Sequence, residues 1–528
     1  MSRSKTSAPR STPHGRTSRV IWSTDSVRGR GQHGSWASRS FLSALACLGL
    51  AATGLAATTP LTTATAATST TTRADADATL ELWAPSTLNA YNEGGMVYAS
   101  LGLRVVAPAS NVEIWSHRAS YDEPITSEIR TTTGITPLPA GTLKDFSGID
   151  GFVVLKVRRA GATKPVLRRK LDACLSSTGE RVNPASAPTS PYPRYCSWTP
   201  YAVGSVMGVQ KGWASSIFES TGMRPLALDP GSYVVESNVA RKFWSAFGLT
   251  AATATRTTRL KVIDSCQDCV RGGDQPVANE PGYVHGRAPG DAPSHPSSGR
   301  VVGPVPDLRS LPAFGITLNN KHTTLRFAAT VWNAGNSPLV IDGFRRRDSA
   351  VMDAYQYFFD AAGNQTGYQQ VGTMEFHHAN HNHWHFEDFA RYDLLDAEKN
   401  YVAKSRKQSF CLANTDAVDY TVPGADWQPQ NTDLATACGD EGALSIREVL
   451  SAGSGDTYAQ YRAGQAFKIG DLPNGVYYIR VEGNPDRNLA EADTTNNVAD
   501  RRLRIGGSGA NRWVKVAPIG DIVEPDLF

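Results

Sequence analysis

The sequence predicts a mainly β protein made of two tandem antiparallel, sandwich-like domains. Short apolar stretches, such as Phe152–Val157 and Leu325–Val331, are separated by Gly, Pro, Asn and Ser, a pattern typical of strands and turns. The chain has 528 residues, more than one hydrophobic core usually organises. Between the strand-rich regions, residues 271–300 lose their aliphatic content, which predicts a Gly/Pro-rich flexible linker.

The chain begins with a basic leader followed by an apolar run, Phe41–Leu55, and a small-residue segment ending at Ala66. This order predicts a secretory signal peptide. Cys47 lies inside the apolar run, but too little apolar chain precedes it to favour a lipoprotein anchor. The expected segments are 1–66 for leader and signal peptide, 75–270 for an N-terminal accessory β domain, 271–300 for the linker, 301–507 for a second β domain and 508–528 for a C-terminal tail.

Charge and hydropathy limit the classes of binding partner that the sequence supports. The formal net charge is +4 and 19% of the residues are charged, which is too small a bias to indicate nucleic acid or an anionic membrane. After removal of the signal peptide, no segment approaches the ~20 apolar residues of a membrane span. We therefore expect a secreted or cell-surface protein.

Six cysteines remain after the predicted signal peptide, an even number in a protein bound for an oxidising compartment. They fall in local pairs, which we interpret as three disulfides: Cys174 with Cys196, Cys266 with Cys269, and Cys411 with Cys438. The Cys266–Cys269 spacing is also that of a redox motif. A strand-like stretch precedes it and no recognisable helix follows, which favours a structural disulfide.

Five of the eleven histidines lie between His377 and His385. Within this cluster His381, His383 and His385 alternate, so in an extended segment their imidazoles share one face. The outer pair of a flat strand would lie roughly 13 Å apart, whereas each nitrogen must come within about 2 Å of a bound ion. The spacing therefore predicts a metal site on a locally curved segment, with copper and zinc both open.

His377 and His378 have two interpretations: either could orient a metal ligand or carry protons, and either could be a surface residue.

The cluster and the segments after it resemble the lysyl oxidase family. Phe389–Asp396 follows the histidines as in that family, Lys407-Gln-Ser-Phe-Cys411 resembles its Lys-Ala-Ser-Phe-Cys segment, and Asp456-Thr-Tyr458 resembles its Asp-Thr-Tyr. The resemblance covers about residues 301–505. It implies copper at His381, His383 and His385, and a lysine tyrosylquinone cofactor formed from Lys407 and Tyr458.

The resemblance also implies an activity. A copper- and quinone-dependent amine oxidase, an oxidoreductase acting on CH–NH2 groups with oxygen as acceptor, converts a primary amine to an aldehyde and releases hydrogen peroxide and ammonia. Molecular oxygen and a primary amine, peptidyl or free lysine, are then the expected partners, and lysine side chains of extracellular proteins are one source of that amine.

Two further segments resemble the family: Pro306–Leu308 and Glu491–Asn497. In the family these segments meet at calcium, a hard cation that prefers oxygen ligands. The ligands implied are Asp307, Leu308 through its carbonyl, Glu491, Asp493, Asn496 and Asn497. The alternative is an acidic turn held by local hydrogen bonds.

The sequence departs from the family pattern near the metal. One extra residue separates His377 from His381, Ala379 stands where a cysteine occurs, and Arg391 stands where those enzymes carry a histidine. These differences leave the general base open among Asp393, Glu387 and His377, of which we select Asp393.

Two other functions are considered. One is a secreted copper-binding, non-catalytic cell-surface β protein, which would bind metal without a carbonyl-reactive cofactor. The other is a zinc hydrolase whose base is Glu387 or Asp388. The hydrolase leaves the segments around Lys407 and Tyr458 unexplained.

Overall fold

The computed structural model describes residues 80–524, with gaps. The residues outside the description within this range are 94, 98–100, 132–133, 177–178, 218–224, 265–291, 302, 347–348, 361, 378–382, 406–408, 430–433 and 463. Several predictions therefore lie outside the described residues: the leader and signal peptide, the Cys266–Cys269 pair, His378, Ala379, His381 and Lys407.

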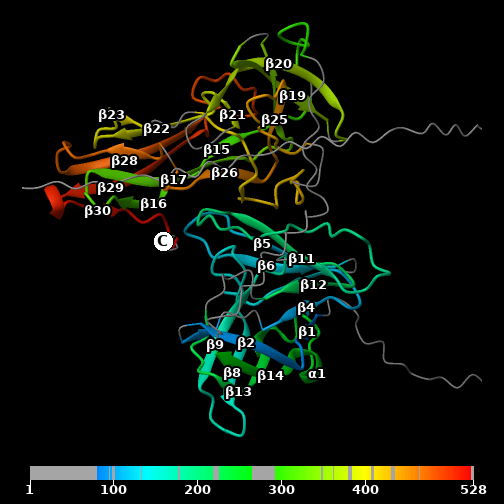
Figure 1. The fold of residues 1–528 in the computed structure, drawn as a ribbon. Coiled ribbons are helices and arrows are strands. Elements are labelled where there is room, and N and C mark those ends of the chain that lie inside the picture. The colour runs from blue at the N-terminus through cyan, green and yellow to red at the C-terminus, as the bar shows by residue number, and fades with distance from the viewer. Residues whose placement is uncertain are drawn as a thin grey trace, which may run out of the picture. The chain divides into compact units, whose positions relative to one another are not determined.

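Residues 81–264 form three sheets and a short helix, α1 (Ala251–Ala254), beside β1 and β14 (Figure 1). In pairing order the sheets are β1 (Glu81–Trp83), β4 (Arg104–Val106), β12 (Trp213–Ser216), β10 (Glu180–Arg181); β11 (Gly204–Val209), β5 (Val112–His117), β6 (Thr126–Arg130), β7 (Ile135–Pro137); and β3 (Met96–Val97), β2 (Thr87–Glu93), β14 (Thr255–Asp264), β13 (Gly231–Val239), β8 (Ile149–Arg159), β9 (Leu167–Ala173).

Residues 308–516 form three more sheets. In pairing order these are β15 (Leu308–Ser310), β17 (Thr324–Asn333), β26 (Ser454–Tyr458), β24 (Asp416–Ala417), with β16 (Phe314–Leu318) and β27 (Ala466–Lys468) also on β17; β21 (His383–Phe386), β20 (Gln365–His377), β19 (Val351–Phe359), β18 (Leu339–Arg345), β25 (Ser445–Leu450); and β23 (Tyr401–Lys404), β22 (Ala390–Leu395), β28 (Gly475–Gly483), β29 (Val498–Gly506), β30 (Trp513–Val516).

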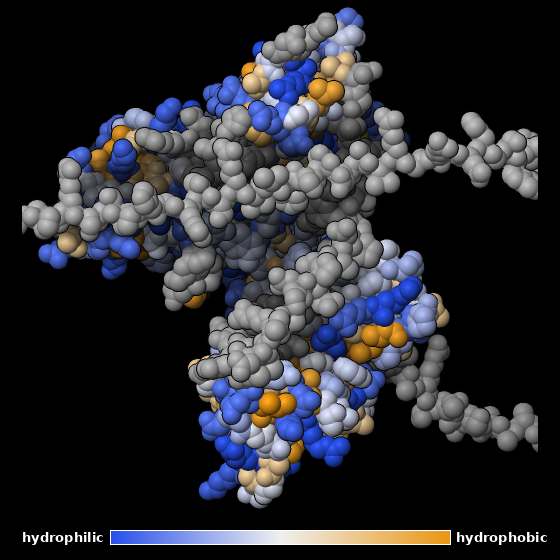
Figure 2. Space-filling model, in the orientation of Figure 1, coloured by the Kyte–Doolittle hydropathy of each residue, from blue (hydrophilic) through white to orange (hydrophobic). Residues whose placement is uncertain are grey.

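The predicted mainly β fold is confirmed, and its strands pack around separate hydrophobic cores. One large core draws all its buried residues from Leu80–Val262 and another from Leu308–Ile505. The face seen in Figure 2 is mostly hydrophilic, with small separate hydrophobic patches between the polar residues. Burial of the alternating apolar residues is thus the main stabilising contribution within each region.

One strand pair differs from the antiparallel prediction. β2 and β14 pair in parallel, with Thr87 opposite Arg259. Parallel neighbours need a long crossover connection. The strands lie at opposite ends of the N-terminal region, so nearly the whole region forms that connection.

The described ends of the predicted linker and tail, residues 292–300 and 508–524, form hydrogen bonds with neighbouring strands. At the end of the linker, the Pro296 carbonyl accepts from the Gln370 amide at 2.7 Å and Ser298 donates to the Tyr368 carbonyl at 3.0 Å. In the tail, Trp513–Val516 is strand β30, paired with β29. Both segments complete sheet edges, because an unpaired edge leaves backbone donors and acceptors exposed.

Two predicted disulfides are present, Cys174–Cys196 and Cys411–Cys438. Among the described residues, no helix combines the length and the apolar composition that a membrane span needs.

Candidate active site

The metal segment begins with two neighbouring imidazoles on β21. His383 and His385 are separated by one residue and lie on the same face of the strand, with ring centroids 4.8 Å apart. His385 is fully buried, and its Nδ1 lies 3.4 Å from Ser409 Oγ. The third predicted ligand, His381, lies outside the described residues. Within them, no group of three His, Cys, Asp or Glu side chains is arranged to hold a metal.

The segment that follows Lys407 pairs with this strand. The Phe386 amide donates to the Phe410 carbonyl at 2.7 Å, and the Phe410 amide donates back at 2.9 Å. The Trp384 amide donates to the carbonyl of Cys438, the disulfide partner of Cys411, at 3.0 Å. Backbone pairing and a disulfide therefore fix residues 409–411 beside the metal segment.

The same short segment contacts Tyr458, the last residue of β26. The rings of Phe410 and Tyr458 meet edge to face with centroids 4.8 Å apart. The Cys411 amide hydrogen-bonds to the Tyr458 phenol oxygen. The structure thus joins the metal segment, the residues after Lys407 and the predicted cofactor tyrosine in one buried cluster.

The surroundings of Tyr458 favour its neutral form. Burial raises the pKa of its phenol far above the ordinary value, and the charges of Asp456 and Glu448 raise it further. The Cys411 amide opposes this shift because it stabilises the phenolate. Without an added cation, the protein therefore keeps this phenol protonated.

Glu448, which sequence analysis did not select, lies close to the cofactor segment. Its side chain is fully buried, and Oε2 accepts from the Leu412 amide at 2.9 Å. The alternation of residues in the sequence could have identified Glu448. Ile446, Glu448 and Leu450 share one face of β25, and the two aliphatic residues belong to the core. A carboxylate in a core-facing row indicates a specific polar role.

Asp393, the selected base, lies in a different environment. It follows Tyr392 on β22, so its side chain projects to the opposite face from that buried ring. Arg391 Nε lies 3.3 Å from Asp393 Oδ2. Burial raises the pKa of Asp393, and Arg391 opposes the rise. Its charged neighbours in the described part of the chain are Arg391, Glu482, Arg480 and Lys404.

The other two candidate bases lie at the ends of neighbouring strands, β21 and β20. Glu387 directly follows β21, and its amide donates to the Thr373 carbonyl at 3.1 Å. His377 is the last residue of β20, and its side chain lies outside the description.

The predicted calcium ligands come together in two adjoining segments. The Leu308 amide donates to Glu491 Oε2 at 2.9 Å, and Asn496 Nδ2 donates to Asp307 Oδ1 at 3.0 Å. Asn497 Nδ2 donates to Glu491 Oε1 at 2.7 Å. Carboxylates and amides, of which Asp307 and Asn497 are buried, therefore meet where β15 begins and β28 leads into β29.

The fit of this cluster to a cation is mixed. The amide oxygens of Asn496 and Asn497 are buried without a hydrogen-bond partner, as expected of oxygens that face a ligand. Asp493 differs, because it is exposed and accepts from the Thr495 amide and hydroxyl. Asp307 also pairs with Arg309 at 2.8 Å, which would compete with a cation.

The lysyl oxidase family model matches residues 361–515. The C-terminal region is a member of the lysyl oxidase family. The match contains the three histidines, Lys407, Tyr458 and the segment from Glu491 to Asn497, and begins after Asp307 and Leu308.

Known relatives support the same family. Mouse (Mus musculus) lysyl oxidase homolog 4 is 31% identical over 145 residues, which are 27% of this chain and 17% of that protein. Chicken (Gallus gallus) lysyl oxidase homolog 2 is 35% identical over 131 residues, 25% of this chain and 15% of that protein. Rat (Rattus norvegicus) protein-lysine 6-oxidase is 34% identical over 135 residues, 25% of this chain and 29% of that protein. The chain thus spans less than a third of these relatives.

Proposed function

We propose that the lysyl oxidase region oxidises primary amines to aldehydes, using copper and a lysine tyrosylquinone formed from Lys407 and Tyr458. Residues 409–411 carry this proposal, because Ser409 contacts His385 and Cys411 contacts Tyr458. Family membership supports amine oxidation at the level of the family.

The donor set of β21 suits copper. His383 and His385 offer imidazole nitrogens from one face, and we propose that His381 completes the set. Copper with molecular oxygen supplies the oxidation that converts a tyrosine ring to a quinone, and the quinone supplies the electron acceptor for the amine. The Ser409 hydroxyl, beside His385 Nδ1, helps to orient the His385 imidazole.

The chain itself positions the reacting ring. Phe410 packs against one side of Tyr458, and the Cys411 amide holds its phenol oxygen. His385 is fully buried and Tyr458 is partly buried against the core, so both side chains are largely shielded from solvent. Because the phenol pKa is raised, a cation near the ring is needed to ionise it.

The general base and the calcium site stay proposals. Asp393 remains the selected base, although its charged neighbours are Arg391, Glu482, Arg480 and Lys404. We propose calcium at the Asp307–Glu491 cluster, supported by the two buried amide oxygens of Asn496 and Asn497.

We also propose secretion and an extracellular amine substrate such as a protein lysine side chain. The two disulfides support an oxidising compartment.

The non-catalytic copper-binding protein is the second candidate, since imidazoles alone would bind metal. The paired placement of residues 409–411 against Tyr458 favours the oxidase, because metal binding needs no ordered tyrosine. The zinc hydrolase is less favoured: Asp388, one of its candidate bases, is an exposed turn residue with φ of 58°.

Tyr458→Phe tests the oxidase. In copper-loaded protein supplied with a primary amine and oxygen, this change should reduce peroxide production to the uncatalysed background, because Phe lacks the oxygen from which a quinone forms. Tyr461→Phe is the matched control, since Tyr461 is 60% exposed. Peroxide production by Tyr458→Phe at the wild-type rate would contradict the proposal, and copper binding without peroxide from wild type would favour the non-catalytic candidate.

A further inference from the structure

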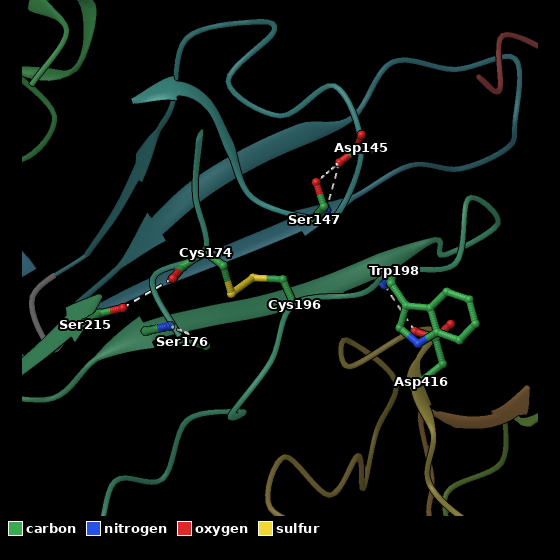
Figure 3. The surroundings of a disulfide bond; sticks show 9 residues. Asp145, Ser147, Cys174, Ser176, Cys196, Trp198, Ser215 and Asp416 are labelled. Carbon is green, nitrogen blue, oxygen red and sulfur yellow. Dashed lines mark hydrogen bonds between the residues drawn. A yellow bond between two sulfur atoms is a disulfide. The ribbon is translucent and has the colours of Figure 1, made fainter. Parts of the chain in front are cut away.

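Two segments far apart in the sequence meet at β24 (Figure 3). Ser197 Oγ and the Trp198 amide both donate to Asp416 Oδ1, at 3.2 and 3.3 Å. The Trp198 indole N–H donates to the Thr415 carbonyl at 3.2 Å. Asp416 is buried, so residues of the N-terminal region supply donors that this carboxylate needs inside the lysyl oxidase region.

Backbone hydrogen bonds extend this contact. The Val203 amide donates to the Val418 carbonyl at 3.0 Å, and the Tyr420 amide donates to the Gly204 carbonyl at 3.2 Å. A Cβ on Gly204 would lie 2.1 Å from Asp419 Oδ1. A side chain at position 204 would therefore displace the Asp419 and Thr421 side chains, which pack directly against this glycine.

A buried aromatic side chain reinforces the contact. Tyr201, from the N-terminal region, is fully buried in a cluster whose other buried members all come from the strand-rich region of residues 308–516. Those members are Leu311, Phe314, Ala328, Trp332 and Val418. The Tyr201 hydroxyl donates to Glu524 Oε1 at 3.1 Å and accepts from Arg501. The contact thus combines a hydrophobic cluster with hydrogen bonds from polar side chains around it.

Thr415 and Asp416, which the N-terminal region contacts, lie directly beside strand β26, which carries Tyr458. β24 pairs with β26, and Asp416 lies opposite Gly455. The Thr415 amide donates to the Gly455 carbonyl at 3.0 Å, and the Thr457 amide donates to Thr415 Oγ1 at 2.7 Å. Tyr458 is the next residue along the strand.

We infer that the N-terminal β domain positions the Tyr458 strand and is required for efficient formation of the quinone cofactor. Ser197, Trp198 and Gly204 are positioning residues, which act through Thr415 and Asp416. A misplacement of about 1 Å can slow a positioned reaction by about 100-fold. This inference rests on the proposed function, since it concerns the cofactor of that same site.

Gly204→Ala in the full-length chain is the main test, because the added methyl group would overlap the Asp419 and Thr421 side chains and disturb the contact between the two segments. Gly134→Ala is its matched control, since a Cβ there meets no atom within 4 Å. Apo-protein is supplied with copper in air, and two quantities are followed: bound copper, and quinone titrated with phenylhydrazine. We expect Gly204→Ala to form quinone at least tenfold more slowly at equal copper content, within the range of such misplacement effects, and Gly134→Ala to match wild type.

Ser197→Ala and Trp198→Phe keep the test decisive if Gly204→Ala does not fold. Each removes one donor without adding bulk, and quinone is then counted per folded chain. Hydrogen exchange at the Thr457 amide provides a second readout that needs no cofactor, and it should become faster in these variants.

Two outcomes overturn the inference. In one, the variants unfold at lower temperature but form quinone at the wild-type rate per folded chain. In the other, exchange at Thr457 is unchanged. Absence of quinone from wild type is distinguishable, because it contradicts the proposed function while the exchange measurement still decides whether the N-terminal domain positions the strand.

Discussion

At the scale of single residues, the most informative feature is the enclosure of Tyr458. Its sequence motif indicated the residue, but the charges around it depend on packing between distant strands. Glu448 lies on β25, and Cys411 is held by the disulfide to Cys438. Local pattern alone could not place these groups at one phenol, since they come together only through tertiary contacts.

Asp416 makes a pH-dependent contribution to stability. Burial raises its pKa to about 8, and hydrogen bonds from Trp198 and Ser197 oppose the rise only partly. The folded protein therefore binds this proton more tightly than the unfolded chain, whose carboxyl titrates near 3.8. The contribution is complete below pH 3.8 and is lost as the pH rises through about 8.

We predict that Asp416→Asn weakens the decrease in unfolding temperature between pH 4 and pH 8, because an amide does not ionise. Thermal unfolding followed by circular dichroism across this range measures the effect. Asp229→Asn is the control, since the Asp229 side chain is 82% exposed. An unchanged pH profile in Asp416→Asn would show that this carboxyl does not titrate with folding.

At the scale of elements, sequence periodicity predicted well which residues form strands, but it predicted poorly which segments pair with those strands. The alternation of His383 and His385 correctly placed both rings on one face of β21. The curvature predicted for the triplet is untested, because His381 lies outside the described residues. Pairing of residues 409–411 with that strand is a long-range contact that no local motif specifies.

The calcium proposal belongs to this scale, because the cluster joins the start of β15 to the connection between β28 and β29. We predict that Ca²⁺ raises the unfolding temperature of wild type. At a free concentration about 100 times Kd, ligand binding adds about 2.7 kcal/mol of stability. Calorimetry with Ca²⁺, with Mg²⁺ and with a chelator measures the change.

Glu491→Gln is the matched variant for that experiment. It removes the charge but keeps an oxygen that can accept from the Leu308 amide, so the calcium-dependent increase should disappear. A wild-type chain with the same unfolding temperature in calcium and in chelator would exclude the site and favour a turn held by local hydrogen bonds.

At the scale of the whole molecule, composition and periodicity predicted a mainly β chain with two strand-rich regions, and the two large cores agree with that expectation. The domain boundaries stay predictions. Sequence analysis missed the extensive contact between the regions: residues 72–528 form one compact unit, and Tyr201 is buried among residues of the second strand-rich region. A single buried tyrosine carries no local signal of its partner.

The most direct test of the central claim is peptide mass spectrometry of full-length protein matured in air with copper. The account predicts a covalent cross-link between the peptides that contain Lys407 and Tyr458, together with the mass change of an oxidised ring. Both peptides unmodified in a fully copper-loaded sample would contradict it and would favour a copper-binding protein without catalytic function.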